Sequence, residues 1–518
     1  MIMSFLNLRM LKLIWSKILA LSILLLLGVI IYSNTFLGPF HFDDIYNIVD
    51  NPAIKHLFNL GNIWNSFPAR FVTFFSFALN YQIHQLNVVG YHIVNLIVHL
   101  GSALLLWWLA SLTLLTPVMK EQKIAQQAKL VSFFIALVFL THPIQTQGVT
   151  YITQRATSLA TLFYLASLSC YAKFRLLQSE ESAQGSRKAY YFGALITAVI
   201  AMFTKEMVIT LPLAICLYEF SFFKTPRRLN YKQLIPFLST LLVIPLTMLA
   251  TKSGTLREMW RVNEGSIAIS FWHYLLTKLM VMATYVRLAF LPLNQNLDYD
   301  FPIVMNILRV PILVSLFFLV GFIIAAFRLF RNYRLVSFGI LFFFLTMLFE
   351  WSIIPIPEAI YEHRLYLPMV GFSIFLVSSL YYLVGSKNLK AMLTILVTLV
   401  IAYSVLTYTR NNVWKDDLTL WNDTVHKSPH KARPYNNRGL AYQNKGDFNL
   451  AFSDYSKTIE IDPKDAEAYK NRAEVYFLNK KYDQAWEDVR KAQALGYKVK
   501  SDFIEQLQKS IQNEKSPY

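Results

Sequence analysis

Long hydrophobic runs, separated by short polar stretches, follow one another through the first 409 residues of the chain. A helix that crosses a bilayer needs about 20 mostly apolar residues, and most of these runs approach that length. The chain has 518 residues, 55% of them hydrophobic, and a mean hydropathy of +0.39. The pattern predicts an all-α, polytopic membrane domain over residues 1–409 with about 11 spans, at residues 13–33, 90–115, 129–141, 156–172, 189–204, 207–223, 233–251, 308–327, 335–353, 365–386 and 390–409.

Two hydrophobic segments depart from this simple alternation. The first run follows three basic residues, is long for a signal peptide and ends without a small-residue cleavage pattern, so it is expected to remain as a signal-anchor. Residues 272–293, in the second outer loop (252–307), are apolar enough to span but contain His273, Lys278 and Arg287. Counted as a span, they would reverse the side of the arginines that follow residue 327. An interfacial or re-entrant helix on the outer face is therefore predicted, and a twelfth span is the alternative.

The charge distribution orients the chain in the membrane. The net charge is +18, but from residue 410 onward 19 basic and 16 acidic residues nearly cancel, which argues against nucleic-acid binding. Starting from an inside N-terminus, the inner side collects 19 basic residues, among them Arg187, Lys188 and Lys232, and only four acidic ones. This asymmetry follows the positive-inside rule and places residues 410–518 outside. Both cysteines lie in apolar runs and form no disulfide or zinc framework.

The C-terminal part of the chain, residues 410–518, repeats with a period of 34 residues. Small residues at two positions of each repeat let two helices pack closely, and aromatic residues fill the groove between them. This arrangement is typical of the tetratricopeptide repeat (TPR). We expect a degenerate half repeat at 414–429, repeats at 432–465 and 466–499, and a capping helix at 501–513. The packing positions are Tyr435, Gly439, Tyr442 and Ala451 in the first repeat and Tyr469, Ala473, Tyr476 and Ala485 in the second.

Polar residues of the membrane part collect at the outer ends of the predicted spans. The adjacent acids Asp43 and Asp44 begin the first outer loop, 34–89, where either a solvated turn or a general base at the membrane surface would suit them. The other sites also have structural alternatives, as turns, hinge ion pairs, helix ends or headgroup anchors. Taken together on one membrane face, they predict a single outward-facing polar cavity. These other sites are Arg70, His142, Arg155, Lys205, Glu206, Asp298, Asp300, Glu362, His363 and Arg364.

The order of these motifs resembles that of a known family. Phe42-Asp43-Asp44 is followed by Arg70, Gly90-Tyr91-His92, His142-Pro143, Arg155, Thr204-Lys205-Glu206, Leu297-Asp298-Tyr299, Arg364-Leu365-Tyr366 and Arg410-Asn411-Asn412-Val413-Trp414, and then by the repeats. Over nearly its full length the chain resembles the transmembrane, TPR-containing O-mannosyltransferases and their bacterial relatives, within the GT-C class of glycosyltransferases. Its repeat array is shorter than that of eukaryotic members.

The resemblance implies an enzyme that moves mannose or a similar hexose from a polyprenyl-phosphate carrier to an acceptor hydroxyl, with inversion, on the outer membrane face. Asp43 would be the general base, and Asp44 would orient it or the acceptor. Cationic side chains, Arg364 first, would hold the lipid phosphate. The donor-binding set would be Arg364, His363, Arg155, Lys205, Glu206 and His142, with acceptor or loop contacts from Arg70, Asp298 and Glu362. No metal is obligatory, although Mg²⁺ or Mn²⁺ at the acidic pair is an alternative.

Two other classes of protein are alternatives to a transferase. A transporter of lipid-linked substrates predicts polar residues through the middle of the spans, and a membrane-anchored TPR scaffold leaves the acidic pair without a role. A transferase would act on a lipid-linked donor within the bilayer and on a protein or peptide acceptor held by the concave TPR surface, although the repeats could instead cap or dimerise the membrane domain. A glycan or lipid acceptor also stays open. The expected location is a bacterial inner membrane with periplasmic repeats, or an endoplasmic reticulum membrane with lumenal repeats.

Overall fold

The computed structural model describes residues 2–179, 181–223, 231–250, 271–307, 309–351 and 360–515. Helices account for the regular structure of these residues, and no strand occurs among them. The chain divides into two compact units: a membrane unit of residues 1–295 and 302–412, and a second unit of residues 296–301 and 413–518. The expected all-α fold class is confirmed.

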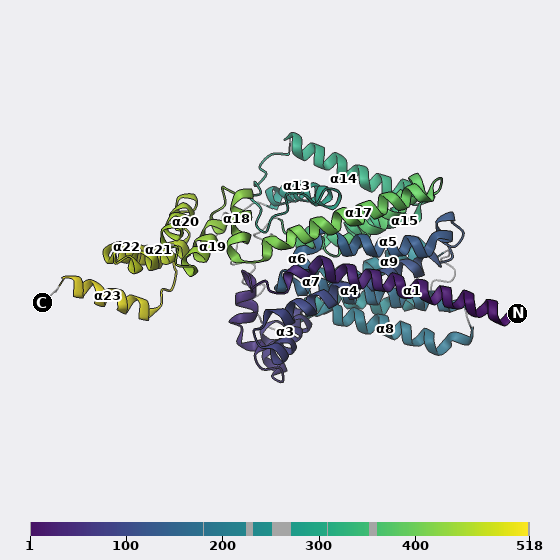
Figure 1. Cartoon of the computed structure of the whole chain (residues 1–518), viewed down its shortest axis with the longest axis horizontal. Coiled ribbons are helices and arrows are strands. Elements are labelled where there is room, and N and C mark those ends of the chain that lie inside the picture. Colours follow the sequence, from purple (N-terminus) through teal and green to yellow (C-terminus); the bar gives the residue numbers. More distant parts are fainter. Residues whose placement is uncertain are drawn as a thin grey trace. The chain divides into compact units, whose positions relative to one another are not determined.

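The membrane unit is a bundle of long helices that run roughly parallel to one another (Figure 1). A helix forms within each range where a span was expected, and another forms at 271–290. Among the residues that the structure describes, six helical segments are long and apolar enough to cross a membrane: 17–35, 88–114, 123–141, 310–329, 368–385 and 389–414. A count of 11 spans thus stays a prediction, as does the interfacial helix. The helices are α1 (Ile2–Tyr32), α4 (Val88–Leu114), α5 (Ala128–Thr141), α7 (Arg155–Leu176), α8 (Gln184–Met202), α9 (Leu211–Phe222), α10 (Ile235–Ser239), α11 (Val243–Ala250), α13 (Phe271–Phe290), α14 (Val310–Leu329), α15 (Arg334–Met347), α16 (Pro368–Leu380) and α17 (Leu389–Asn411).

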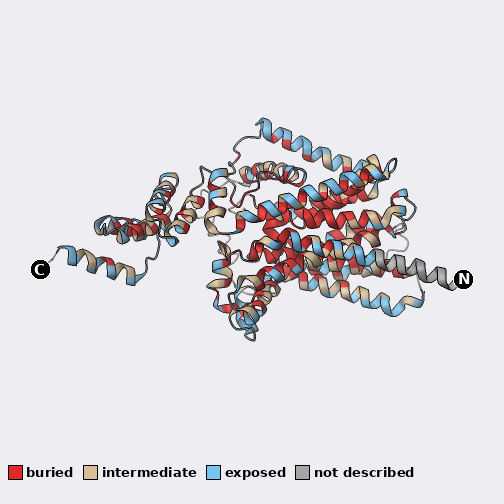
Figure 2. Ribbon diagram, viewed as in Figure 1, coloured by how far each residue is buried: buried red, intermediate tan, exposed pale blue. Residues whose placement is uncertain are grey.

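Burial separates central from peripheral helices (Figure 2). In the segments that contain α5 and α16, 61% of the most apolar 18-residue stretch is buried. In those that contain α14 and α17, only 22% of that stretch is buried. An outer face made of exposed leucine, isoleucine, valine and phenylalanine is what a helix at the lipid boundary requires, since lipid and not water is its solvent. The central helices are therefore the ones that can place polar groups away from lipid.

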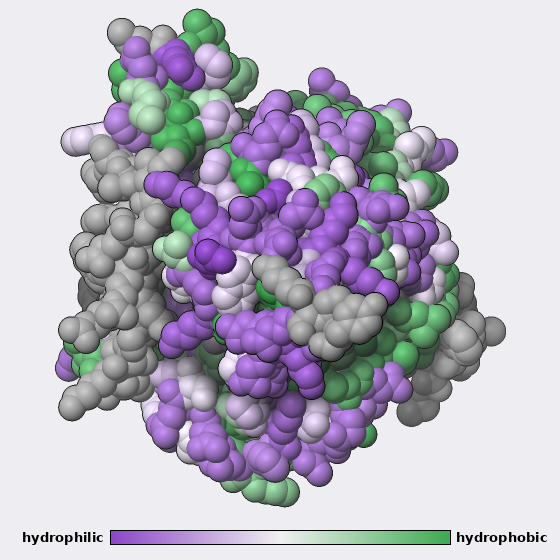
Figure 3. All heavy atoms as spheres, turned by 90° about the vertical axis from the view of Figure 1, so that its left-hand side faces the viewer, coloured by the Kyte–Doolittle hydropathy of each residue, from purple (hydrophilic) through white to green (hydrophobic). Residues whose placement is uncertain are grey.

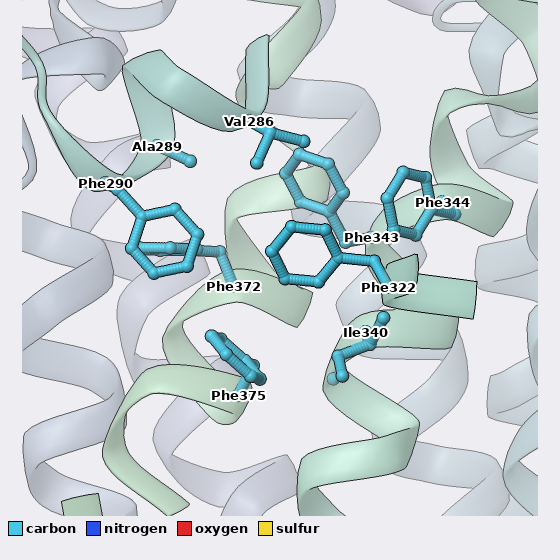
Figure 4. Close-up of a pocket in the computed structure, with 10 residues that line it drawn as sticks. Val286, Ala289, Phe290, Phe322, Ile340, Phe343, Phe344, Phe372 and Phe375 are labelled. Atoms are coloured by element: carbon cyan, nitrogen blue, oxygen red, sulfur yellow. The ribbon is translucent and has the colours of Figure 1, made fainter. Parts of the chain in front are cut away.

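An aromatic cluster fills the space where α13, α14, α15 and α16 meet (Figure 4). Phe290, Phe322, Phe343, Phe372 and Phe375 point toward one another there, and the open space left between them is only about 30 Å³. That volume is close to the share of one water molecule in liquid water. The cluster is thus packed core.

Two hydrogen bonds connect the first outer loop to this helix bundle. Residues 34–89 form short helices, including η2 (Ile45–Val49), η3 (Pro52–Ile54), α2 (Leu60–Ser66) and α3 (Phe71–His84). The start of α3 is fixed to the turn after α8, because the Val72 amide donates to the Phe203 carbonyl at 2.9 Å and the Thr73 hydroxyl donates to the Thr204 carbonyl at 2.9 Å. This attachment brings the loop and the Thr204-Lys205-Glu206 motif together.

The second unit contains the repeat helices α18 (Asp417–Lys427), α19 (Ala432–Asn444), α20 (Phe448–Ile461), α21 (Ala466–Leu478), α22 (Tyr482–Ala494) and α23 (Ser501–Lys515). The small packing residues are buried: a Cβ at Gly439 would lie 2.8 Å from the Tyr455 ring, and Ala451, Ala473 and Ala485 are fully buried. The small residues allow the paired helices to approach closely, as the sequence predicted.

One ion pair recurs in both full repeats. Arg438 forms a bidentate pair with Asp454, both bonds 2.7 Å, and Arg472 does the same with Asp488 at 2.8 and 2.9 Å. Each guanidinium also lies over the rings of tyrosines one turn away on its own helix. Because the planar guanidinium offers two parallel donors, the pair sets the angle between the helices of a repeat as well as their separation.

A short strap from the loop between α13 and α14, residues 296–301, also belongs to the repeat unit. Arg433 donates to both carboxylate oxygens of Asp298 at 2.7 Å, and Lys431 forms an ion pair with the same carboxylate. The Ser428 hydroxyl donates to the Asp298 carbonyl at 2.7 Å and accepts from the Asp300 amide at 2.9 Å. Burial alone would raise the pKa of Asp298, but the bonds and charges of Arg433 and Lys431 outweigh it and hold that pKa below its usual range.

The contact at Gly439 yields a prediction for the repeat unit. We expect Gly439→Val to lower its stability by about 1–3 kcal/mol, because a branched side chain overpacks against Tyr455. Thermal unfolding followed by circular dichroism would measure the change. Leu440→Ala is the matched control, since Leu440 is 38% exposed on the same helix and should change the midpoint little. Equal midpoints for Gly439→Val and the wild type would contradict this packing argument.

Candidate active site

The carboxylate of Asp44 is fully buried and held on both oxygens. Its Oδ1 accepts from the Thr153 amide at 2.7 Å and from the Thr153 hydroxyl, and its Oδ2 accepts from the His41 amide at 3.0 Å. Burial raises the pKa of Asp44 to about 6, because the hydrogen bonds from Thr153 and His41 compensate only in part for lost hydration. A carboxylate committed to three donors acts as a structural anchor of the turn.

Asp43 is more accessible, and the backbone before it is strained. Phe42 has a positive φ of 45°, a conformation that non-glycine residues seldom adopt and that persists only where surrounding contacts enforce it. The amide of Asp43 donates to the hydroxyl of buried Tyr151 at 3.0 Å. The turn at 151–153 thus holds both acids, Asp43 through Tyr151 and Asp44 through Thr153, and leaves Asp43 half-buried.

Beneath this turn, Arg155 is buried at the start of α7. Its guanidinium donates to Asn95 Oδ1 at 2.6 Å and to Asn80 Oδ1 at 2.7 Å, and it also bonds the carbonyls of Ser76 and Tyr91. It lies over the Phe77 ring, 4.6 Å from its centroid. Arg155 therefore joins α3, α4 and α7.

A cluster of charged side chains lies on the other side of Asp43. Arg70 Nε donates to Glu206 Oε1 at 2.8 Å and Arg70 Nη2 donates to Oε2 at 3.0 Å, and Asp43 lies within electrostatic range of Arg70. Although burial raises the pKa of Glu206, the charge of Arg70 outweighs it and lowers that pKa below its usual range. Lys205 Nζ donates to Gln154 Oε1 at 3.1 Å and to Thr157 Oγ1 at 2.6 Å.

The segment Glu362-His363-Arg364 completes the cluster. His363 is buried, and its pKa is lowered well below the usual range, first by burial and then by the charges of Lys205, Arg364 and Arg70. Burial and the positive charges of Lys205, Arg364 and Arg70 all disfavour the charged imidazole of His363. Its amide donates to Gln147 Oε1 at 3.0 Å, and its ring stacks on Tyr361 at 5.2 Å between centroids. Glu362 is fully buried and accepts from Gln295 Nε2 at 3.1 Å.

Several polar groups near this cluster were not singled out from the sequence. The Gln145 amide, the Thr146 hydroxyl and His363 Nδ1 are buried without a hydrogen-bond partner among the described residues. Tyr151 and Thr153, which hold the acids, were also missed. The available signal was the polar run from Gln145 to Gln154 between two apolar helices, because a polar segment buried among apolar ones needs partners.

Two of the predicted site residues make other contacts. His142 is buried at the end of α5, where its Nε2 bonds the Ala289 carbonyl at 3.0 Å and its Nδ1 accepts from the Ile144 amide at 3.3 Å. Asp298 belongs to the repeat unit, in the strap described above. The structure brings together Asp43, Arg70, Lys205, Glu206, His363 and Arg364.

Known proteins resemble this chain in its repeats and over most of its length. Residues 432–465 and 455–487 match tetratricopeptide repeat families. The chain is 25% identical to the protein O-mannosyl-transferase F38B6.6 of Caenorhabditis elegans over 86% of its length, 25% identical to Tmtc3 of Drosophila melanogaster over 90%, and 24% identical to TMTC3 of Homo sapiens over 92%, both of which are also named protein O-mannosyl-transferases. The chain is a homologue of these transferases.

The homology extends through the membrane unit and into the repeats. The chain spans 63%, 58% and 55% of the length of the three relatives. No solved structure matches it. The chain itself has apolar helices followed by C-terminal tetratricopeptide repeats, which is the organisation that its motif order predicted.

The raised pKa of Asp44 predicts a pH-dependent stability. The folded-state pKa of about 6 lies above the ordinary 3.8, so the stabilisation is full below pH 4 and is lost as the pH rises through 6. Between pH 4 and 7, we expect the wild type to lose about 2 kcal/mol relative to Asp44→Asn, which cannot titrate. Thermal unfolding of both proteins in detergent at several pH values would measure this difference. Exposed Asp50→Asn should follow the wild type, and parallel curves for Asp44→Asn and wild type would refute the assignment.

Proposed function

We propose that the chain is an inverting glycosyltransferase that moves mannose or a similar hexose from a polyprenyl-phosphate carrier to a hydroxyl of a protein acceptor on the outer membrane face. The observation that carries this proposal is a half-buried carboxylate, Asp43, in a loop outside the spans and within electrostatic range of Arg70, whose charge also acts on His363 together with those of Lys205 and Arg364. The homologues named protein O-mannosyl-transferases support the reaction class.

In the proposed reaction, the Asp43 carboxylate takes the proton of the acceptor hydroxyl while that oxygen attacks the anomeric carbon of the sugar. The bond between the anomeric carbon and the phosphate oxygen breaks, and its electron pair leaves with the polyprenyl phosphate. Attack from the face opposite the leaving group inverts the anomeric centre. The strained backbone at Phe42 and the Tyr151 contact would keep the carboxylate oriented toward the acceptor.

The leaving phosphate needs fixed positive charge, since charge develops on its oxygen as the bond breaks. Arg364 is our first choice, because a guanidinium holds phosphate through two parallel bonds, and Lys205 is the second. Neutral His363, whose Nδ1 has no hydrogen-bond partner among the described residues, is placed to bond a sugar hydroxyl. Arg155 would act indirectly, through the position of the turn that holds both acids.

A metal ion is not required by this chemistry, because a monophosphate leaving group can be neutralised by the cations alone. Both oxygens of Asp44 are already bonded to Thr153 and His41, which disfavours the alternative of Mg²⁺ or Mn²⁺ held by the acidic pair. We further propose that the concave surface of the TPRs presents the acceptor peptide, in the periplasm of a bacterium or the lumen of the endoplasmic reticulum.

The proposed base is tested by Asp43→Asn. We expect it to lower transfer from polyprenyl-phosphate mannose by about 10²–10⁴-fold while donor binding persists, since the amide cannot accept the proton. The assay uses radiolabelled donor, purified full-length chain, and membranes from cells that lack it as the acceptor source. Arg364→Ala in the same assay should weaken donor binding, and Arg364→Lys should restore it only in part.

Asp50→Asn is the matched control, because Asp50 is an exposed acid on the same loop. It should transfer at the wild-type rate. If Asp43→Asn retains wild-type turnover and Asp44→Asn does not, then the roles within the pair are reversed. Full activity in both variants would remove the acidic pair from the mechanism.

The side of the membrane can be tested by cysteine labelling in a Cys170→Ser, Cys216→Ser background. In intact cells with a permeable outer envelope, Lys464→Cys should react with an impermeant maleimide, whereas Lys188→Cys should react only after lysis; both positions are exposed. If both stay protected until lysis, residues 272–293 cross the membrane as a twelfth span, and the repeats cannot present an acceptor to Asp43.

A further inference from the structure

The Arg70 guanidinium stays partly exposed although it is paired with a carboxylate. Its Nε and Nη2 atoms donate to the two oxygens of Glu206 at 2.8 and 3.0 Å, and 44% of the side chain is exposed. A guanidinium has five N–H donors in a fixed planar arrangement, and this pair uses two of them. The hydrogen bonds among the residues that the structure describes engage no further donor of this side chain. Arg70 can therefore bind a second oxyanion.

The ion pair with Glu206 sets the direction in which the remaining donors point. Glu206 begins η10 (Glu206–Thr210), and its side chain is mostly buried. Two parallel bonds to this fixed carboxylate occupy the Nε–Nη2 edge of the guanidinium, so the Nη1–Nη2 edge is held in one orientation. That second edge has the geometry that grips a phosphate through two bonds. Because Glu206 already offsets part of the charge of Arg70, a ligand must gain affinity from further contacts.

The surroundings of Arg70 offer apolar contacts of this kind. Two elements, α2 and α11, pack beside η4 (Pro68–Arg70), the short helix that ends at Arg70. On α2, Leu60 and Trp64 are exposed, and their spacing of four residues places them on one helical face. The Trp64 ring lies 5.7 Å from the rings of both Phe71 and Phe203. An exposed indole is therefore held in place next to the residue that follows Arg70.

The second element, α11, presents an apolar stripe. Leu242, Leu246 and Leu249 are each more than half exposed, and their spacing of four and three residues places them on one face. Ile244 and Thr247, on the other side of the helix, are buried. The stripe is about 10 Å long, and an exposed apolar face of this kind on a membrane helix is in contact with lipid. A lipid-facing track thus lies on a helix that packs beside Arg70.

A ligand for this region must satisfy a cation and an apolar surface together. Hydrophilic side chains predominate on the end of the molecule that Figure 3 shows, whereas the exposed leucines of α11 belong to a predicted span. A phosphate that carries a long hydrocarbon chain suits both, because the phosphate binds the guanidinium while the chain stays among apolar side chains and lipid. Asp43 lies within electrostatic range of Arg70, so that phosphate would be bound beside the proposed base.

We propose that Arg70 receives the phosphate of the lipid-linked sugar donor as it leaves the bilayer, and that the polyprenyl chain lies along Leu246 and Leu249. The inference rests on the proposed function and adds to it the route by which the donor enters. Arg364 and Lys205 then hold the phosphate during transfer. The nearness of the proposed base favours the polyprenyl donor over a bilayer phospholipid, which has no sugar to transfer.

The test measures equilibrium binding of two radiolabelled lipid phosphates to the purified full-length chain in neutral detergent. One is a full-length polyprenyl phosphate, and the other is citronellyl phosphate, which has the same head group on a short chain. Arg70→Gln should weaken the binding of both by about 10–100-fold, because bonds to a charged phosphate are lost. Leu246→Ser with Leu249→Ser should lower the preference for the long chain on the order of 10-fold.

The role of Glu206 in orienting Arg70 is tested by a double-mutant cycle. Glu206→Gln should weaken polyprenyl phosphate binding in the wild-type background but cause no further loss in the Arg70→Gln background, since it acts only through Arg70. Arg70→Lys should restore binding only in part, because an ammonium lacks the planar pair of donors. Additive losses in the cycle would contradict this role of Glu206.

The matched control for the leucine pair is Leu313→Ser with Leu316→Ser, two exposed leucines with the same spacing on α14. Arg287→Gln, at an exposed arginine of the second outer loop, is the control for Arg70. Both controls should bind the two lipid phosphates like the wild type. Equal changes in a test variant and its control would mean that general surface properties attract the lipid, and the proposal would fall. Thermal unfolding midpoints identify any variant that is misfolded, and Arg70→Lys then replaces Arg70→Gln in the comparison.

Because no acceptor is present, binding is measured separately from transfer. A chain that transfers mannose but binds both lipid phosphates equally well in every variant would overturn this inference alone. A chain that behaves as expected in binding but transfers no sugar would overturn the proposed function alone. Phosphatidylglycerol serves as a competitor: if it displaces polyprenyl phosphate at equal concentration and the leucine variants weaken both alike, the surface binds lipids in general and the polyprenyl assignment is wrong.

Discussion

The buried guanidinium of Arg155 is the constraint on which the outer end of the membrane unit depends. A buried charged group without water needs hydrogen-bond partners, and here two asparagines and two carbonyls from α3 and α4 accept four bonds from the guanidinium. Removing one of these partners typically costs about 1–3 kcal/mol, because a buried polar group is then left without its hydrogen bond. The position of α7 relative to α3 and α4 is therefore set by charge satisfaction as well as by apolar packing.

From that fixed point, the chain builds an acidic pair whose members differ in environment although they are neighbours in sequence. The turn before α7 supplies Thr153 to one acid and Tyr151 to the other. One carboxylate is bonded on both oxygens and buried, and the other is half-buried beside Arg70. Two carboxylates with different surroundings can divide the work of anchoring and proton transfer, as pairs of catalytic acids do elsewhere.

The all-α class and the repeat array followed from periodicity, because apolar runs and a 34-residue spacing are local signals. The gathering of Arg70, Lys205 and His363 was also foreseeable, since each stands at the same end of a predicted span. The partners of Arg155 and His142 were not, because a lone cation or imidazole in sequence does not reveal whether a carbonyl or a ligand satisfies it. Asp298 shows the same limit: its partners lie more than 130 residues further on, where no local pattern points to them.

The strap at residues 296–301 has a consequence for how the chain assembles. Asp298 is synthesised well before Lys431 and Arg433, the cations that later enclose it. Contacts between residues so far apart in sequence form late, because the closure of a long loop must come first. The contacts of Lys431 and Arg433 in the first full repeat therefore form only when residues 296–301, which are synthesised much earlier, pack against that repeat. A fragment that begins at residue 413 would contain these two cations without the Asp298 carboxylate that neutralises them. Its charge at this position would therefore differ from that of the repeat unit in the intact chain.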